Sequence, residues 1–512
     1  MTPRRLALEL AILAAVCAGV FWTRLGATGI SMSEGHRVLP AWEMLDSGEW
    51  LVPRLFGQAY LRKPPGMPWA VALSSEVFGR TEFAVRAVSA VSATAMAFLA
   101  YGFARRWFGP PWALAAGLMS ALTPVFWSTG RSAEIEALNN AASMAAVLLL
   151  LDVTVFRGLV ARRSRSGAVF SVVLLAVALL AAALAKGPAS VPCLVAAIGA
   201  ACIATRSAGP LRDAVMWGGV ALAGAGVGAL AWAILRAAEG LSPVLQGPGE
   251  FLWNGQSLSA RAVWRVVKLA PESLAIALPA TLGLIVCFRG RAARSSEEPG
   301  TADSGVRMAS ALAWTCLLSL AIFVTTGVNN PRYTLPAFTI VPLLAAFVAR
   351  EAATGLDERG RRLARTLLLG SPLAWPVVLL IAAGVYVGVV EPRKRASSGR
   401  EPGIALAAAL PDGAEVWADD LIEARPEVLH YARQRAAGEG RRVTIRWMPR
   451  RGGPPRIPPE SGNEEKRYIV LRTDTGSNER ELCRQSGALD RLRPVTDGRV
   501  HDFAFTLYEV IR

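Results

Sequence analysis

The sequence predicts an α-helical polytopic membrane protein with a small soluble α/β domain at its C-terminal end, and three observations indicate this fold class. Of the 512 residues, 53% are hydrophobic and only 18% are charged, and the mean hydropathy is +0.36. The apolar residues gather in long runs separated by short basic clusters. From about Glu401 the composition becomes that of a soluble protein. Because a chain this apolar is not an ordinary soluble enzyme, we expect residues 1–391 to form a membrane domain and residues 392–512 a soluble one.

The apolar runs are long enough to cross a bilayer as helices, which takes roughly 17 to 25 residues each. With the N-terminus on the cytoplasmic side, the inner connections carry the arginine clusters, as the positive-inside rule requires. The first run continues beyond a typical signal core, so we expect a retained helix. This topology predicts a multi-pass protein of the cytoplasmic (inner) membrane, with the first outer loop (residues 26–82) and the C-terminal domain extracytoplasmic. About eleven runs qualify; they lie near residues 6–25, 83–104, 111–128, 137–156, 168–185, 189–205, 214–236, 271–288, 308–326, 332–349 and 366–390.

The C-terminal domain shows the alternating apolar residues of half-buried strands. Its first segment indicates a strand followed by a helix, and a Pro/Gly-rich connector at residues 450–466 interrupts the pattern. These features predict a small α/β domain. Strands are expected within AEVWADD, RRVTIRWM, KRYIVLRTD and DFAFTLYEVI.

Several function classes are disfavoured by the same sequence. The net charge is +16, but the basic residues lie at the ends of apolar runs and form no stripe with interleaved aromatics, so we expect no nucleic-acid partner. The six cysteines are widely spaced and five of them fall in apolar runs, which argues against a disulfide framework or a cysteine-built metal site. Neither a GxxxxGK[ST] nor a HExxH motif occurs, so nothing supports ATP-driven transport or a zinc protease site.

The stretch from Ser31 to Trp69 is the first place to look for a site. It follows the first apolar run, yet it contains Glu34, Arg62 and Lys63, with the double proline Pro64-Pro65 next to the last of these cations. Functional residues are often found on long loops that a rigid scaffold positions. We therefore expect chemistry in this loop.

Further polar residues occur at the predicted outer ends of later spans. Glu136, Lys186 and Arg332 each stand at such an end, where a charge costs several kcal/mol unless it is paired or hydrated. Both signs of charge in one polar cavity suit a lipid-phosphate substrate: cations such as Lys63 would hold the phosphate. Carboxylates such as Glu34 would act as a general base or would anchor a metal ion.

An ordered set of motifs resembles a known family. The run EGHRVLPAWEMLDSGEWLVPRLFGQAYLRKPPGMPW is followed by FGRTEFAVRAVSA, ARRWFG, GRSAEIEAL, AKGPA and PRYTLPA. Their order is similar to that of the bacterial branch of the protein O-mannosyltransferase superfamily, which includes the lipid A aminoarabinose transferases, over roughly residues 30 to 345. The resemblance implies a C-type glycosyltransferase fold with a catalytic first outer loop. It also implies a hexosyl- or pentosyltransferase that uses a sugar on a polyprenyl phosphate, such as undecaprenyl phosphate, and a lipid, glycan or protein acceptor, among membrane lipids.

The carboxylates of the family are only partly present. Ser33-Glu34 stands where the family usually has Asp-Glu, and Glu136 replaces an aspartate of the second outer loop. Because a serine is no base at neutral pH without help, we expect Glu34 to be the base or the carboxylate that orients the acceptor. Glu34 and Glu136 are therefore the predicted catalytic residues.

The family's phosphate-binding cations are better preserved. Lys63 matches the lysine before the double proline, Lys186 the Lys-Gly-Pro turn, and Arg332 the Arg-Tyr-x-x-Pro turn. Arg62 stands where an acidic residue is usual, and would either add a phosphate contact or extend to lipid headgroups. We predict these four residues to bind the donor phosphate. The resemblance allows a divalent metal, but Ser33 and two glutamates make a weak hard-cation set, and no metal ligands are assigned.

Each assignment has a simpler alternative. Glu34 and Glu136 could be acids favoured at helix N-termini, and the cations could be interfacial anchors. His36 is expected on a solvated face. For the whole protein, a non-catalytic relative that binds lipid phosphate is the main alternative, because Ser33 and Arg62 depart from the family. A lipid transporter or flippase is less favoured, because the sequence shows no pair of interrupted helices in two halves.

Overall fold

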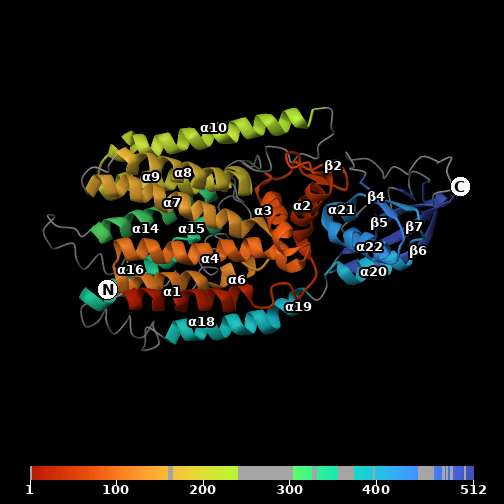
Figure 1. Cartoon of the computed structure of the whole chain (residues 1–512), viewed down its shortest axis with the longest axis horizontal. Coiled ribbons are helices and arrows are strands. Elements are labelled where there is room, and N and C mark those ends of the chain that lie inside the picture. The colour runs from red at the N-terminus through yellow and green to blue at the C-terminus, as the bar shows by residue number, and fades with distance from the viewer. Residues whose placement is uncertain are drawn as a thin grey trace. The chain divides into compact units, whose positions relative to one another are not determined.

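The structure is a computed structural model, and it describes most of the chain. The described residues are 3–159, 165–239, 304–325, 331–355, 374–395, 398–447, 466–474, 479, 483–484, 488–500 and 503–511. They form two compact units, of which the first comprises Met1–Arg24, Arg86–Ala233 and Gln246–Val389 and the second Leu25–Val85, Ile234–Leu245 and Val390–Arg512. Figure 1 shows the helices and strands of both.

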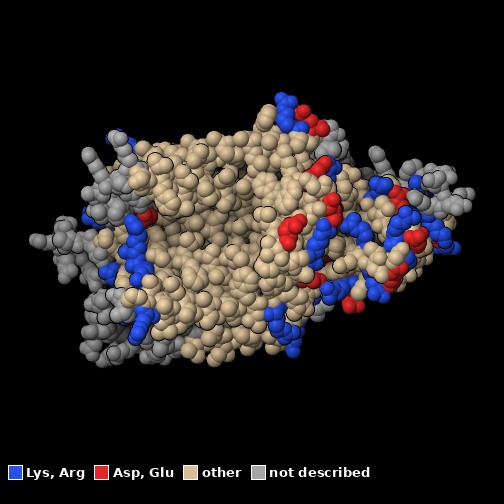
Figure 2. All heavy atoms as spheres, in the orientation of Figure 1, with Lys and Arg blue, Asp and Glu red and all other residues tan. Residues whose placement is uncertain are grey.

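The first unit is a bundle of apolar helices. α7 packs against α8 and α9, α14 against α9, and α5 against α16. On the face drawn in Figure 2, the described residues over the middle of these helices are uncharged, and Lys and Arg gather at the helix ends. The helices are α1 (Pro3–Cys17), η1 (Ala18–Trp22), α4 (Glu82–Trp107), α5 (Pro110–Leu122), α6 (Pro124–Thr129), α7 (Ile135–Leu159), α8 (Arg165–Lys186), η3 (Gly187–Ser190), α9 (Val191–Thr205), η4 (Gly209–Arg212), α10 (Ala214–Ala237), α14 (Ser304–Thr325), η5 (Pro331–Thr334), α15 (Leu335–Phe338), α16 (Val341–Gly355), α18 (Ala374–Val385) and η6 (Tyr386–Val390).

The helices agree with a multi-pass membrane protein. Seven helices among the described residues are long and apolar enough to cross a membrane, by length and composition. One of these stretches, Ser166–Thr205, contains the two expected runs 168–185 and 189–205, with η3 between them. Of the α7 stretch, 72% is buried inside the protein, against 11% for α10. α7 is therefore central in the bundle and α10 peripheral.

Three expected spans differ from the others. The run 111–128 is not one continuous helix: α5 ends at Leu122 and α6 starts at Pro124, because a proline interrupts helical hydrogen bonding. The run 271–288 lies outside the described residues, and the run 366–390 is described only from Ala374.

The second unit contains the first outer loop and the C-terminal domain. The loop folds into short helices and a two-stranded hairpin, in which Arg54 pairs with Ala59. Within this unit α2 packs against both α3 and α22. The elements are η2 (Met32–Glu34), α2 (Gly35–Ser47), β1 (Arg54–Leu55), β2 (Gln58–Ala59), α3 (Gly66–Phe78), α19 (Glu391–Arg395), α20 (Arg400–Ala408), β3 (Ala414–Ala418), α21 (Asp420–Ala424), α22 (Pro426–Gly438), β4 (Val443–Trp447), β5 (Arg467–Arg472), η7 (Ala488–Arg491), β6 (Leu492–Val500) and β7 (Phe503–Val510).

The C-terminal domain is built on a five-stranded sheet in the order β4-β3-β5-β7-β6. β3 is parallel to β4 and β5, whereas β7 is antiparallel to β5 and β6. The four strands expected from the sequence, now β3, β4, β5 and β7, are confirmed. β6 was missed because most of its residues are polar and exposed, so it lacks the apolar alternation of a half-buried strand.

Candidate active site

Glu34 is fixed at the start of α2 by two sets of contacts. The backbone N–H of Ser31 donates to Glu34 Oε2 at 3.0 Å, as part of a capping box. Arg395 of α19 donates from Nη1 to Glu34 Oε1 at 3.0 Å, and it also pairs with Glu391 at 3.2 Å. Glu34 is 1% exposed. A buried carboxylate held in this way is rigidly placed and its charge is compensated.

Arg62 and Lys63 follow the β1–β2 hairpin and precede α3. Arg62 forms an ion pair with Glu423 of α21, a partner in the C-terminal domain. Lys63 is half-buried directly before the two prolines. The family usually has an acid at this position. Here the carboxylate comes from Glu423 of α21 instead, and the ion pair explains why the cation is tolerated.

The first unit brings Glu136 and Lys186 together. Glu136 begins α7, and Lys186 ends α8, where Gly187 adopts a left-handed backbone with φ of 64° that reverses the chain. Lys186 Nζ lies 3.3 Å from Glu136 Oε1 and 4.4 Å from the centre of the Tyr333 ring. Both charged side chains are buried. The three residues therefore form a compact cation site with a carboxylate below and an aromatic face above it.

Arg332 lies in the same unit on η5. Its Nη1 is 3.0 Å from Glu134 Oε2, and about half of its side chain is exposed. The fully buried Arg131 donates to the carbonyl oxygens of Val20 and Thr23. Arg131 therefore fastens the segment that carries Glu134 and Glu136.

Sequence reasoning missed several residues of these clusters. Tyr333 was part of the quoted PRYTLPA motif but was not chosen. Arg395 was not singled out in the sequence, and its ion pair with Glu34 shows its structural role. The Ser31-x-x-Glu34 spacing is itself a capping-box signature and could have been found. His36, expected on a solvated face, is buried instead, and burial lowers its pKa to about 3.

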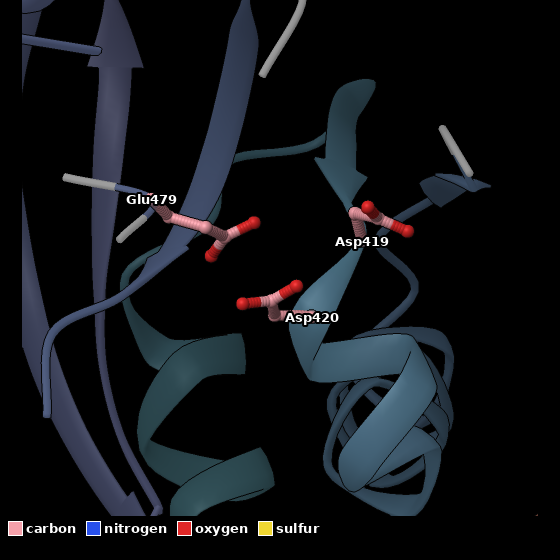
Figure 3. Close-up of side chains that lie close together, drawn as sticks. All are labelled: Asp419, Asp420 and Glu479. Carbon is pink, nitrogen blue, oxygen red and sulfur yellow. The ribbon is translucent and has the colours of Figure 1, made fainter. Parts of the chain in front are cut away.

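Three carboxylates outside these clusters lie close enough together to hold a metal ion. The oxygens of Asp419, Asp420 and Glu479 are within 4.8 Å of one another. Figure 3 shows Asp420 and Glu479 facing each other. However, Asp419 accepts a hydrogen bond from the Trp447 indole at 3.0 Å and Glu479 accepts one from the Arg472 backbone at 2.6 Å. These hydrogen bonds connect Asp419, directly before α21, to β4, and connect Glu479 to β5. None of the predicted site residues belongs to this group of carboxylates.

The helix bundle, the loop of short helices and the C-terminal sheet define a polytopic membrane protein with the C-type glycosyltransferase fold. The structure is similar over nearly its whole length to ArnT from Cupriavidus metallidurans. Against ArnT bound to undecaprenyl phosphate, the TM-score is 0.67 at 16% identity, covering 99% of this chain and 98% of that chain. Against apo ArnT, the TM-score is 0.68 at 17% identity, covering 97% of each. At this identity the likeness concerns the fold.

Sequence comparisons find similarity to one family over part of the chain. Residues 62–232 match the family model described as dolichyl-phosphate-mannose-protein mannosyltransferase. An undecaprenyl phosphate-alpha-4-amino-4-deoxy-L-arabinose arabinosyl transferase of Pseudomonas savastanoi pv. phaseolicola is 41% identical over 78 residues, which is 15% of either chain. One from Aeromonas hydrophila is 40% identical over 62 residues, 12% of this chain and 11% of that one. These matches span a small part of the relatives. They agree with the predicted resemblance to the bacterial branch of the protein O-mannosyltransferase superfamily, as similarity over these segments.

Proposed function

We propose that this chain is an integral membrane glycosyltransferase that moves a sugar from a polyprenyl-phosphate donor to an acceptor on the outer face of the cytoplasmic membrane. The buried group of Lys186, Glu136 and Tyr333 supports this proposal most directly. Glu136 compensates the charge of the buried Lys186, and a phosphate is a strong alternative partner for such a cation. The similarity to this family indicates the same class of donor.

The reaction places specific demands on the cations. An acceptor hydroxyl attacks the anomeric carbon, the bond from that carbon to the phosphate oxygen breaks, and polyprenyl phosphate leaves with one more negative charge than the donor phosphate carried. Cations fixed beside the phosphate stabilise this developing charge. We assign this role to Lys186 and Arg332 of the first unit; for Lys63 and Arg62 of the first outer loop it stays a prediction from the sequence.

The carboxylates would accept the proton that the acceptor hydroxyl loses when it attacks. In the structure Glu136 holds Lys186 at 3.3 Å. When donor phosphate takes over Lys186, the ion pair between Lys186 and Glu136 weakens and Glu136 can accept a proton. Both Glu34 oxygens already accept hydrogen bonds, which favours Glu34 as the carboxylate that orients the loop and acceptor.

The names of the relatives guide the choice of donor. Both are named as transferases of 4-amino-4-deoxy-L-arabinose from undecaprenyl phosphate. We therefore place an undecaprenyl-phosphate aminopentose first among donors and a polyprenyl-phosphate hexose second. Lipid, glycan and protein acceptors share the attacking hydroxyl or amine, and a lipid glycan acceptor is the first to test.

The test is donor turnover by the purified full-length protein in lipid nanodiscs. With labelled undecaprenyl-phosphate aminopentose and a lipid extract as acceptor, wild type should release undecaprenyl phosphate, and Lys186→Gln should lower the rate by about 100-fold or more. Arg206→Gln is the matched control, because Arg206 is an exposed cation at the far end of α9. Equal rates in wild type and Lys186→Gln would refute the assignment.

A non-catalytic lipid-phosphate binder is the second candidate. It is favoured by Ser33, which replaces the usual aspartate, and by the full engagement of Glu34 in structural contacts. Wild type that binds undecaprenyl phosphate through Lys186 but releases none from any labelled donor would establish this function instead.

A further inference from the structure

A second buried carboxyl group lies beside Glu34 and has no role in the mechanism above. Glu427 is in the first turn of α22, in the C-terminal domain, and its side chain is completely buried. Neither of its carboxyl oxygens has a hydrogen-bond partner. An isolated carboxylate would be very costly in such a place, so the group is held as a neutral acid. Burial raises the pKa of Glu427 to about 8, with a smaller contribution from the negative charge of Glu34.

The Glu427 side chain fills a space that two glycines leave open. Its Oε2 lies 3.0 Å from the point where a Cβ would stand on Gly35, the residue directly after Glu34. Its Cγ lies 2.5 Å from the corresponding point on Gly399. A side chain at either glycine would displace Glu427. The carboxyl group is therefore enclosed between the start of α2 and the segment before α20.

α22 also contacts the chain directly before the Ser31–Glu34 turn. The Tyr431 hydroxyl accepts a hydrogen bond from the Ile30 backbone N–H at 2.7 Å and donates one to Glu82 at 3.0 Å. Ile30 immediately precedes the Ser31–Glu34 turn. α22 therefore contacts the chain directly before and directly after this turn, through Tyr431 and Glu427 respectively.

One further contact of α22 with α2 is uncharged as well. The ring of His430 lies 4.9 Å from that of Trp42, centre to centre, and burial lowers the pKa of His430 to about 3. Trp42 donates to Ser75 of α3 at 3.1 Å. At neutral pH α22 therefore places a protonated acid, a neutral imidazole and a tyrosine against the loop, and Arg433 adds a cation that lies 5.9 Å from the centre of the Phe56 ring.

We propose that protonated Glu427 is a positioning residue through which the C-terminal domain holds the Ser31–Glu34 turn, and that loss of its proton releases the turn. An ionised Glu427 would face the carboxylate of Glu34 with no donor of its own, and two buried like charges repel strongly. The charged groups that act on it are Glu34 on η2 and Arg425 before α22, and Arg425 offsets only part of the effect of burial. Of the cations on the neighbouring segments, Arg395 is shared by Glu34 and Glu391 and Arg400 pairs with Glu82.

The consequence is a domain contact that depends on pH. Below about pH 8 the acid is neutral and α22 packs on the turn; above it the contact weakens. The contribution of the turn to catalysis rests on the proposed function. The contact between α22 and the turn does not depend on that function. The two are therefore tested by separate measurements.

Hydrogen–deuterium exchange tests the contact in the full-length protein in nanodiscs. After correction for intrinsic exchange rates, amides of residues 30–42 in wild type should lose protection by about 10-fold or more between pH 7 and pH 9.5. Glu427→Gln and Glu427→Met cannot ionise, so their protection should not fall. Glu401→Gln, which removes an exposed acid of α20, should behave like wild type.

Sugar transfer measured on the same samples tests the functional part. Wild-type activity should decline above about pH 8, and Glu427→Gln should move that decline to higher pH. If protection in Glu427→Gln and Glu427→Met falls with pH as in wild type, the positioning role is wrong. If the exchange result holds while wild type transfers no sugar from any donor, the contact stands and the proposed function fails.

Discussion

The pKa of Glu427 predicts a specific dependence of stability on pH. In the unfolded chain its carboxyl group ionises near 4.5, and in the folded protein near 8. Between these values the folded state holds a proton that the unfolded state has lost, so stability falls as pH rises. The loss is about 1.4 kcal/mol per pH unit, which gives roughly 3 kcal/mol at pH 7 and about 4 kcal/mol at pH 8, where the loss levels off. Below pH 4.5 this stability is fully present.

Glu427→Gln removes the proton-binding step and keeps the shape of the side chain. The unfolding midpoint of the variant in detergent, measured from pH 5 to pH 8.5, should therefore rise relative to wild type as the pH increases. Glu401→Gln reports the effect of removing an exposed acid and should show no such trend. A difference between Glu427→Gln and wild type that is the same at every pH would show that Glu427 is ionised in the folded protein and would refute the reasoning.

Three further predictions concern other buried charges. Arg395→Met leaves Glu34 buried without its ion-pair partner, and should lower the free energy of unfolding by about 3 to 5 kcal/mol; a denaturant titration with a change below about 1 kcal/mol would contradict the contact. Lys186→Met should weaken binding of undecaprenyl phosphate, measured by ligand titration, by about 10-fold or more. The double variant Lys186→Met/Glu136→Gln should regain thermal stability but not binding. Recovered binding in the double variant would exclude a direct role of Lys186. His430→Phe should reduce the loss of stability on acidification. The imidazole pKa falls from 6.5 to about 3 on folding, so wild type loses stability as the pH decreases from 6.5 towards 3. Identical acid titrations of wild type and variant would disprove this.

Much of the membrane fold could be predicted because its signals are local. Helices of the required length and hydropathy leave a mark in a window of some twenty residues, and the Lys186-Gly187-Pro188 turn appears in the sequence as a break between two apolar runs. The ion pair of Lys186 with Glu136 fits the expectation that charges at membrane ends need partners, although this particular pair was not predicted. The break at Pro124 was overlooked although proline is a local signal too.

The contacts of the first outer loop could not be predicted in the same way. Glu34 and Arg395 are separated by 361 positions in the chain, and no local pattern connects them. Gly35 and Gly399 have no special backbone angle that would have marked them; they are small because the Glu427 side chain needs the space. Residues whose roles depend on such distant packing become visible only in three dimensions. For this reason Arg395 and Glu427 were absent from the predicted site.

The most direct test of the account is the release of undecaprenyl phosphate from a labelled undecaprenyl-phosphate sugar by the purified protein in nanodiscs. We expect release that requires an acceptor, that is lost in Lys186→Gln, and that persists in the control Arg206→Gln. Wild type that binds undecaprenyl phosphate but releases none from aminopentose or hexose donors would contradict the claim that this chain is a glycosyltransferase.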